Sequence, residues 1–123
     1  MAIEKKFDIY DRALKFAIKT AKIIENLPNN IVFREYSKQL IRSSGSIGAN
    51  IEEADGTLTR KDFINKLGIA RRESRESAHW LRLIENIFSG NNPKLKEEIQ
   101  KQIKEAKELM LILSSIINKI KDK

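Results

Sequence analysis

Basic residues on a predicted helical face are the ones in this chain best suited to bind a ligand. Arg72, Arg75 and Arg82 follow one another at helical intervals, with a histidine between the last two. Such a row of cations can hold the phosphate backbone of a nucleic acid without reading its sequence. The candidate phosphate contacts are Arg71, Arg72, Arg75, His79, Arg82, Lys61 and Lys66.

The same stretch also allows an interpretation without a ligand. Glu73, Glu76 and Glu85 lie at helical spacing from these cations and would pair with them on a solvated face. Taken by itself, the row favours this solvated face. Assembly of several copies would change the balance, because symmetry multiplies a modest basic patch.

Catalytic and metal-binding patterns are weak. Glu76 and His79 have the Glu-x-x-His spacing of di-iron sites in helical bundles, but those sites need a second such pair. This chain has one histidine and no cysteine, which argues against di-iron, zinc and nucleophile-triad sites. Glu52 and Glu53 are adjacent, so on a helix they point in different directions. We expect no enzyme activity, no metal and no cofactor.

The segment from Ser43 to Ala54 resembles a glycine-rich phosphate loop when it is considered alone. A phosphate loop needs a preceding strand and a Gly-Lys-Ser/Thr ending, and both are missing. The segment instead continues a helical spacing of four and three residues through Leu40, Ser44, Ile47, Ile51, Ala54 and Leu58. We therefore predict a helix in which Ser44, Gly45 and Gly48 let a neighbouring helix approach closely.

The elements that must position these residues are four helices. The hydrophobic spacing predicts them at about 7–27, 31–55, 59–89 and 93–121, within one domain of residues 1–123. Asn29 or Asn30, Thr59 and Asn92 are suited to cap the last three helices, and Pro93 suits a first helical position. Short connections make successive helices antiparallel neighbours, so the fold class is all-α, an up-down-up-down four-helix bundle.

Three of the helices carry a second apolar stripe. In the first helix the core stripe is expected to be Phe7, Tyr10, Leu14, Ala17, Ala21 and Ile24. The additional residues are Ile9, Phe16, Ile23, Ile69, Trp80, Leu83, Ile87, Leu109, Ile112 and Ile116. On a monomer they would expose a large apolar surface, which is typical of a protein interface. We expect a homo-oligomer; the alternative is a wide core with skewed helices.

The composition of the chain bears on its kind of partner and on its cellular compartment. The 123 residues include 24 basic and 17 acidic ones, which gives a net charge of +7 and is compatible with an acidic partner such as nucleic acid. No apolar run is long enough for a membrane span. With no cysteine to oxidise, we expect a cytoplasmic protein that does not bind membranes.

Residues 39–54 closely resemble the signature of bacterial four-helix-bundle proteins encoded in intervening sequences of 23S ribosomal RNA genes. The likeness continues through residues 62–67, 69–77 and 80–83. It implies a ring-like homopentamer, and no catalytic residue. A related branch, the accessory variability determinant of diversity-generating retroelements, binds nucleic acid and partners a reverse transcriptase.

These considerations together predict a non-enzymatic, basic homo-oligomer that binds RNA or DNA. A reverse transcriptase would be a partner if the chain belongs to the retroelement branch. The alternative function is a protein-binding scaffold or accessory subunit that has no nucleic-acid binding of its own.

Overall fold

The fold consists of four long helices in the computed structural model, which describes residues 6–122 and the side chains from Ile9 onward. The helices are α1 (Lys6–Glu25), α2 (Ile31–Asp55), α3 (Arg60–Ile87) and α4 (Pro93–Lys121). Each end lies within two residues of the expected one, and the described residues contain no strand. None of the four helices has an apolar stretch long enough to cross a membrane.

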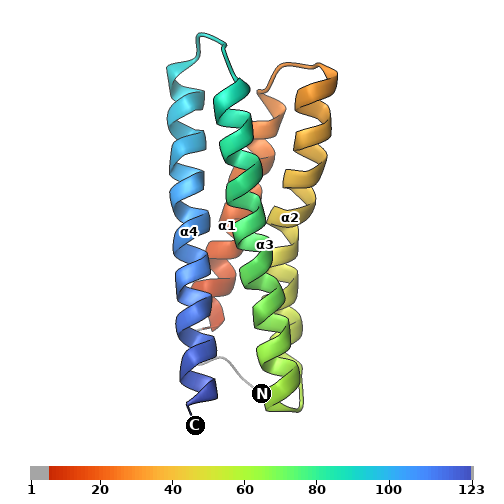
Figure 1. Cartoon of the computed structure of the whole chain (residues 1–123), viewed down its shortest axis with the longest axis vertical. Helices are drawn as coiled ribbons and strands as arrows, with labels where there is room; N and C mark the ends of the chain where they lie inside the picture. The colour runs from red at the N-terminus through yellow and green to blue at the C-terminus, as the bar shows by residue number, and fades with distance from the viewer. Residues whose placement is uncertain (1–5, 123) are drawn as a thin grey trace.

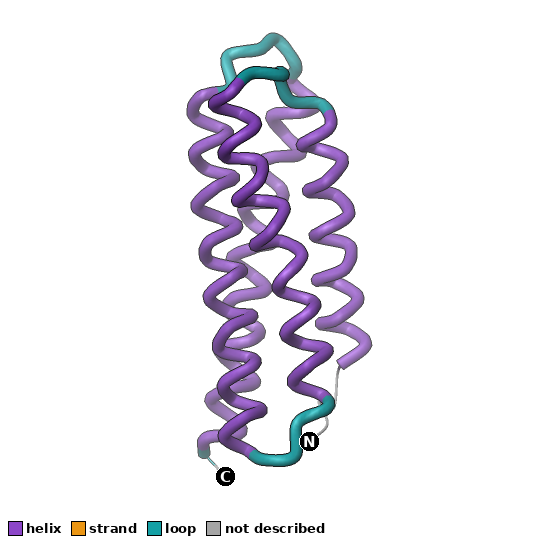
Figure 2. The backbone as a smooth tube through the Cα atoms, turned by 90° about the vertical axis from the view of Figure 1, so that its right-hand side faces the viewer, coloured by secondary structure: helices purple, strands orange, loops and turns teal. Residues whose placement is uncertain are grey.

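The helices alternate in direction around a closed square. The α1–α2 and α3–α4 connections lie at one end and the α2–α3 connection lies at the other (Figures 1 and 2). Each helix packs against its neighbours in the chain, and α4 closes the square against α1. The predicted up-down-up-down four-helix bundle is confirmed.

Side-chain caps fix where three of the helices begin. Asn30 Oδ1 accepts a hydrogen bond from the Phe33 amide, Thr59 Oγ1 from the Asp62 amide, and Asn92 Oδ1 from the Leu95 amide, each at 3.1 Å. Pro93 occupies the first turn of α4, where its missing N–H costs nothing. These caps confirm the predicted helix starts.

The core of α2 and α3 combines aliphatic side chains with buried serines. Leu40, Ile47, Ile51 and Leu81 have no exposed surface. Between the two helices, Ser77 Oγ donates a hydrogen bond to Ser43 Oγ at 2.9 Å. The other two buried serines bond to main-chain carbonyls of their own helices: Ser44 to Ile41 and Ser74 to Ala70. Because serine is small and can satisfy its hydroxyl locally, α2 and α3 pack closely without leaving these four hydroxyls unpaired.

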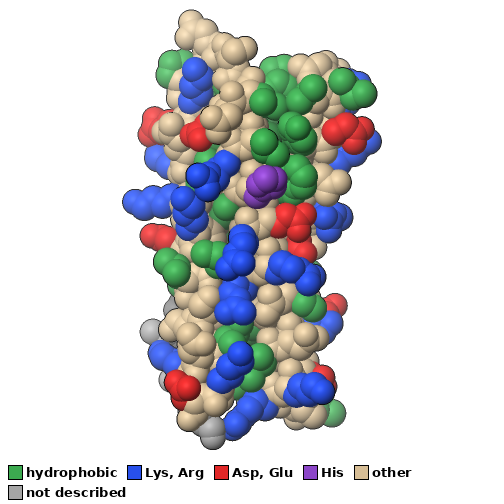
Figure 3. All heavy atoms as spheres, viewed as in Figure 1, with side chains coloured by type: hydrophobic (Ala, Val, Ile, Leu, Met, Phe, Trp, Pro, Cys, Tyr) green, Lys and Arg blue, Asp and Glu red, His purple; other side chains and the backbone are tan. Residues whose placement is uncertain are grey.

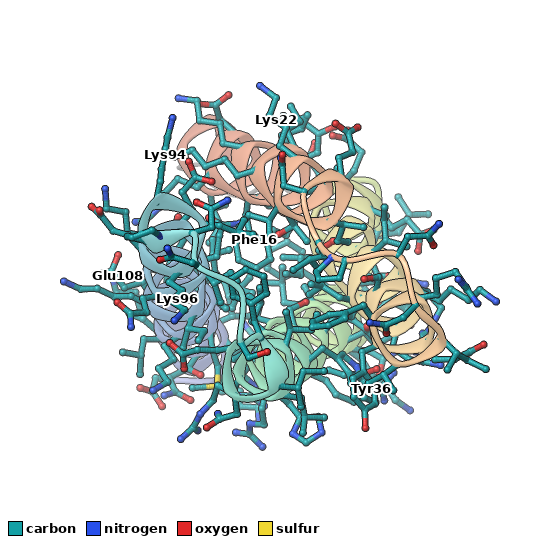
Figure 4. The ribbon with its side chains drawn as sticks, turned by 90° about the horizontal axis from the view of Figure 1, so that it is seen from above. Phe16, Lys22, Tyr36, Lys94, Lys96 and Glu108 are labelled. Carbon is teal, nitrogen blue, oxygen red and sulfur yellow. The ribbon has the colours of Figure 1, made fainter. Side chains whose placement is uncertain are left out.

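The predicted role of part of the second apolar stripe is wrong. Ile9, Phe16 and Ile23 on α1 and Leu109 on α4 are at most 2% exposed, so they belong to the core and not to a subunit interface. Figure 4 shows Phe16 directed into the ring of helices. Leu14, expected in the core, is 39% exposed. The first helix is therefore rotated relative to the expectation, and the wide-core alternative holds for this stripe. The side chain of Phe7 lies outside the described residues.

The rest of that stripe remains partly accessible. Ile69, Trp80, Leu83, Ile112 and Ile116 are half-buried, and Ile87 is exposed. The Trp80 ring packs on Tyr36 of α2, with centroids 5.8 Å apart. Five further large apolar side chains are exposed on α1 and α2, at the opposite side of the square: Leu14, Ile18, Ile31, Val32 and Ile41.

The two glycines of α2 have different surroundings. A Cβ on Gly48 would lie 3.7 Å from Ala13 Cβ, so α1 approaches α2 closely at this position. A Cβ on Gly45 would meet nothing within 4 Å. The prediction that Gly45 permits close packing is therefore wrong, because this residue faces away from the neighbouring helices. Ser44 is buried as expected.

Candidate nucleic-acid interface

A groove between α3 and α4 collects several of the predicted phosphate contacts. It has a volume of about 410 Å³. It contains Arg75, Arg82 and the ring of His79 from α3, and Lys107 from α4. The remaining lining residues are Ser74, Ala78, Leu83, Asn86, Ala106 and Met110. We call this hollow the α3–α4 groove.

Small side chains create the groove. Ser74 and Ala78 lie one turn apart on α3, and Ala106 lies opposite them on α4. All three are buried, but they are too short to fill the space between two packed helices. Long side chains on both sides of this floor, such as Arg75 and Lys107, form the rim. Figure 3 shows Lys and Arg side chains following one another along the line between α3 and α4.

Glu73 and Glu76 of α3 do not neutralise this rim. Glu76 Oε1 accepts hydrogen bonds from Arg42 Nη2 of α2 and from Trp80 Nε1, both at 3.1 Å. Glu73 is 6% exposed and lies 4.0 Å from Arg72. Among the described residues, neither carboxylate forms an ion pair with Arg75 or a later cation of α3. The local pairing that a solvated face requires is therefore limited to the contact of Glu73 with Arg72, and these two glutamates leave Arg75 and Arg82 unpaired.

Glu105 and Glu108 of α4 are likewise engaged elsewhere. Arg12 of α1 donates to Glu105 at 2.6 and 2.9 Å and to Glu108 at 2.7 Å. These bonds draw both carboxylates toward α1. Lys107, between them in the sequence, lines the α3–α4 groove instead. Among the described residues, no ion pair involves Arg75, Arg82 or Lys107.

A second hollow, between α1 and α4, provides a contrast. It has a volume of about 270 Å³, and Arg12, Lys15, Lys19 and Lys101 contribute to its lining. Three of these cations are already paired, Arg12 as described above, Lys15 with Asp11 at 3.0 Å and Lys101 with Glu97 at 3.1 Å. The α3–α4 groove is therefore the better candidate for an anionic ligand.

The remaining predicted contacts lie outside the groove. Arg71 Nη1 reaches across to Ser114 Oγ of α4, at 3.4 Å. Arg72 lies beside Glu73, and Lys66 pairs with Glu53 of α2 at 2.8 Å. Lys61 is exposed near the start of α3 and does not line the groove.

Sequence reasoning missed Lys107, because the lysines of α4 alternate with glutamates and resemble an ordinary surface. The available signal was its position beside Ala106 and three residues before Met110, a small residue and an apolar one on neighbouring positions of the helix. What distinguishes Lys107 from the other lysines is the engagement of Glu105 and Glu108 by Arg12. That contact joins residues more than 90 positions apart.

Glu73 is an unsatisfied acid inside the α2–α3 seam. Its Oε2 is buried without a hydrogen-bond partner. Burial raises the pKa of the Glu73 carboxyl above its usual value, and Glu76 adds to the rise, while Arg42 and Arg72 oppose it. The native state therefore binds this proton more tightly than the unfolded state does. Stability is highest when Glu73 is protonated, and it decreases as the pH rises from the unfolded pKa through the folded one.

Replacing Glu73 by Gln is expected to stabilise the protein at pH 7 by roughly 1 kcal/mol, because it removes a buried, poorly paired charge. Urea unfolding at pH 4 and pH 7 measures the effect, and the loss of stability between these pH values should be smaller in the variant. The control is Glu76→Gln, which weakens the pair with Arg42 and should not stabilise. An unchanged pH dependence in Glu73→Gln would contradict this account.

The fold and the groove define a class: a basic four-helix bundle with a cation-lined groove between its last two helices. Residues 5–115 match the 23S rRNA-intervening sequence protein family, and the chain belongs to this family. No curated protein matches the chain. Within the described residues, no group of three or more His, Cys, Asp or Glu side chains could hold a metal ion.

A solved structure is similar over almost the whole length. It is a protein of unknown function from the S23 ribosomal protein family of Bacteroides thetaiotaomicron. The two chains share 36% sequence identity, with a TM-score of 0.77. The similarity covers 93% of this chain and 98% of the other.

Proposed function

We propose that this protein is a non-enzymatic, basic homo-oligomer that binds RNA or DNA through the α3–α4 groove. The observation that carries the proposal is the separation of charge across α3 and α4. Glu73 and Glu76 lie on the α2 side of α3, and Glu105 and Glu108 are held by α1. Arg75, Arg82 and Lys107 are left around one hollow, where a phosphate backbone would supply the missing negative charge.

The proposal is tested by equilibrium binding of a labelled 20-mer RNA, both as a single strand and as a duplex, at several salt concentrations. If Arg75, Arg82 and Lys107 each neutralise one phosphate, a single strand should bind with a salt slope of about −2. Its affinity should then fall roughly 20-fold between 50 and 200 mM salt. Failure of the single strand and the duplex to bind at 50 mM salt, both as RNA and as DNA of the same sequence, would overturn the proposal.

Homo-oligomerisation is supported by the apolar side chains that the bundle leaves accessible. These include Ile69, Trp80 and Ile87 on α3, none of which lines the α3–α4 groove. The family resemblance adds the expectation of a homopentamer. Light scattering should then give a mass near five times the 14.2 kDa of one chain. A mass near 14.2 kDa would remove the homo-oligomer from the proposal.

A second candidate function is a protein-binding scaffold without nucleic-acid binding. The accessible apolar residues of α3 also favour this function, because such surfaces commonly contact other proteins. The nucleic-acid binding experiment distinguishes these two candidate functions. A stable assembly that ignores RNA and DNA at low salt would favour the scaffold.

A further inference from the structure

We propose that the α3–α4 groove binds a single nucleic-acid strand, with phosphates on the basic rim and a base against the apolar floor. This inference rests on the proposed nucleic-acid binding and specifies the form of the ligand. A purely electrostatic site would hold either a single strand or a duplex, because both carry phosphates. The shape and the polarity of the groove favour the single strand.

The floor of the groove is apolar, although a site that bound only phosphates would not require an apolar floor. Ala78, Leu83, Ala106 and Met110 contribute to its lining. The volume of about 410 Å³ lies in the usual range for sites that hold small organic groups. An unpaired base presents a flat apolar face of this kind, whereas the bases of a duplex are stacked on one another and paired.

The width of the groove argues against a duplex at the floor. Packed helices have axes roughly 8–10 Å apart, and the hollow between them is narrower than a double helix. A duplex could therefore touch only the rim. A single strand can follow the rim, because Arg75 and Arg82 lie seven residues apart, or about 10 Å along α3. Lys107 faces it from α4.

His79 adds a ring at the edge of the same groove. Its side chain is exposed, and it contacts Trp80 edge to face with centroids 4.9 Å apart. This contact supports the imidazole from one side. Aromatic rings beside a basic groove are typical of proteins that bind single strands, since bases stack on them without regard to sequence.

Three probes test the inference on the unaltered protein. They are a labelled 12-mer of deoxythymidine, an abasic strand with the same twelve phosphodiesters, and a 12-base-pair DNA duplex, all measured at 100 mM salt. We expect the thymidine strand to bind about tenfold more tightly than the abasic strand, with a similar salt slope, because only the base contacts differ. It should also bind about tenfold more tightly than the duplex.

A pair of neighbouring variants locates the base contact. Met110→Ser makes the floor of the groove polar without changing the charge. Leu111→Ser changes the next residue, which is 63% exposed and does not line the groove. The first variant should lose about fivefold in affinity for the thymidine strand and keep its affinity for the abasic strand. The second should bind both strands like the unaltered protein.

The outcomes separate this inference from the proposed function. Equal affinity for the thymidine and abasic strands, or equal or tighter binding of the duplex, would overturn the single-strand inference and leave nucleic-acid binding intact. If none of the three probes binds even at 50 mM salt, both proposals fail. The comparison of probes remains decisive even if Met110→Ser proves poorly folded, because it uses no variant.

Discussion

Phe16→Ala should lower the free energy of unfolding by about 3–5 kcal/mol, which is the usual cost of removing a buried aromatic side chain. Phe16 is 1% exposed in the centre of the bundle. Its loss would leave a cavity beside Gln102, whose Nε2 donates hydrogen bonds to the Phe16 carbonyl at 2.9 Å and to Thr20 Oγ1 at 3.0 Å. Because small proteins are stable by only about 5–15 kcal/mol, this change removes a large share of the total.

Urea unfolding at one fixed protein concentration measures this effect, since assembly would make stability depend on concentration. The matched control is Ile18→Ala on the same helix, where the side chain is 50% exposed. It should cost less than about 1 kcal/mol. If Phe16→Ala cost no more than Ile18→Ala, the rotation of α1 described by the structure would be wrong.

Reversing the charge of Arg75 and Arg82 together should weaken single-strand binding by at least about 100-fold at 50 mM salt. The double variant Arg75→Glu and Arg82→Glu removes two phosphate contacts and places two repelling carboxylates on the rim. Each lost phosphate contact reduces the magnitude of the salt slope by about 0.7 for a single strand. The magnitude of the slope should therefore decrease from about 2 to below 1. The readout is fluorescence anisotropy over a salt series.

The control variant reverses the same amount of charge elsewhere. Lys22 on α1 and Lys38 on α2 are both exposed, and neither lines the groove. Figure 4 shows Lys22 projecting away from the bundle. Lys22→Glu combined with Lys38→Glu should weaken binding only slightly. An equal loss in both double variants would show that net charge, and not the α3–α4 groove, attracts the nucleic acid.

Much of the fold could be predicted because its determinants are local. Asn30, Thr59 and Asn92 sit directly before apolar helical patterns, and each caps the helix that follows. The short connections then leave antiparallel packing as the natural arrangement. Within α2 the buried face was also predictable, since Leu40, Ile47 and Ile51 form one apolar stripe opposite a polar face.

The rotation of α1 could not be predicted in the same way. Both of its stripes are apolar, and local spacing does not say which one faces the other three helices. In the structure, the stripe with Phe16 and Ile23 faces inward and fills the centre of the bundle, whereas Leu14 of the other stripe is partly exposed. Part of the presumed assembly surface is consequently core, and Leu14 and Ile18 are exposed in its place.

For the candidate site, too, some features follow from the sequence and others depend on the packing of the helices. By itself the sequence determined that Arg75, His79 and Arg82 share a helical face, because helical spacing is a property of one segment. Whether the charges of Arg75 and Arg82 are neutralised depends on contacts between segments. Only the tertiary structure decided that Arg42 engages Glu76 and Arg12 engages Glu105, and that Lys107 completes the α3–α4 groove. Charge pairing across helices depends on how the helices pack, and a single helical pattern does not contain that information.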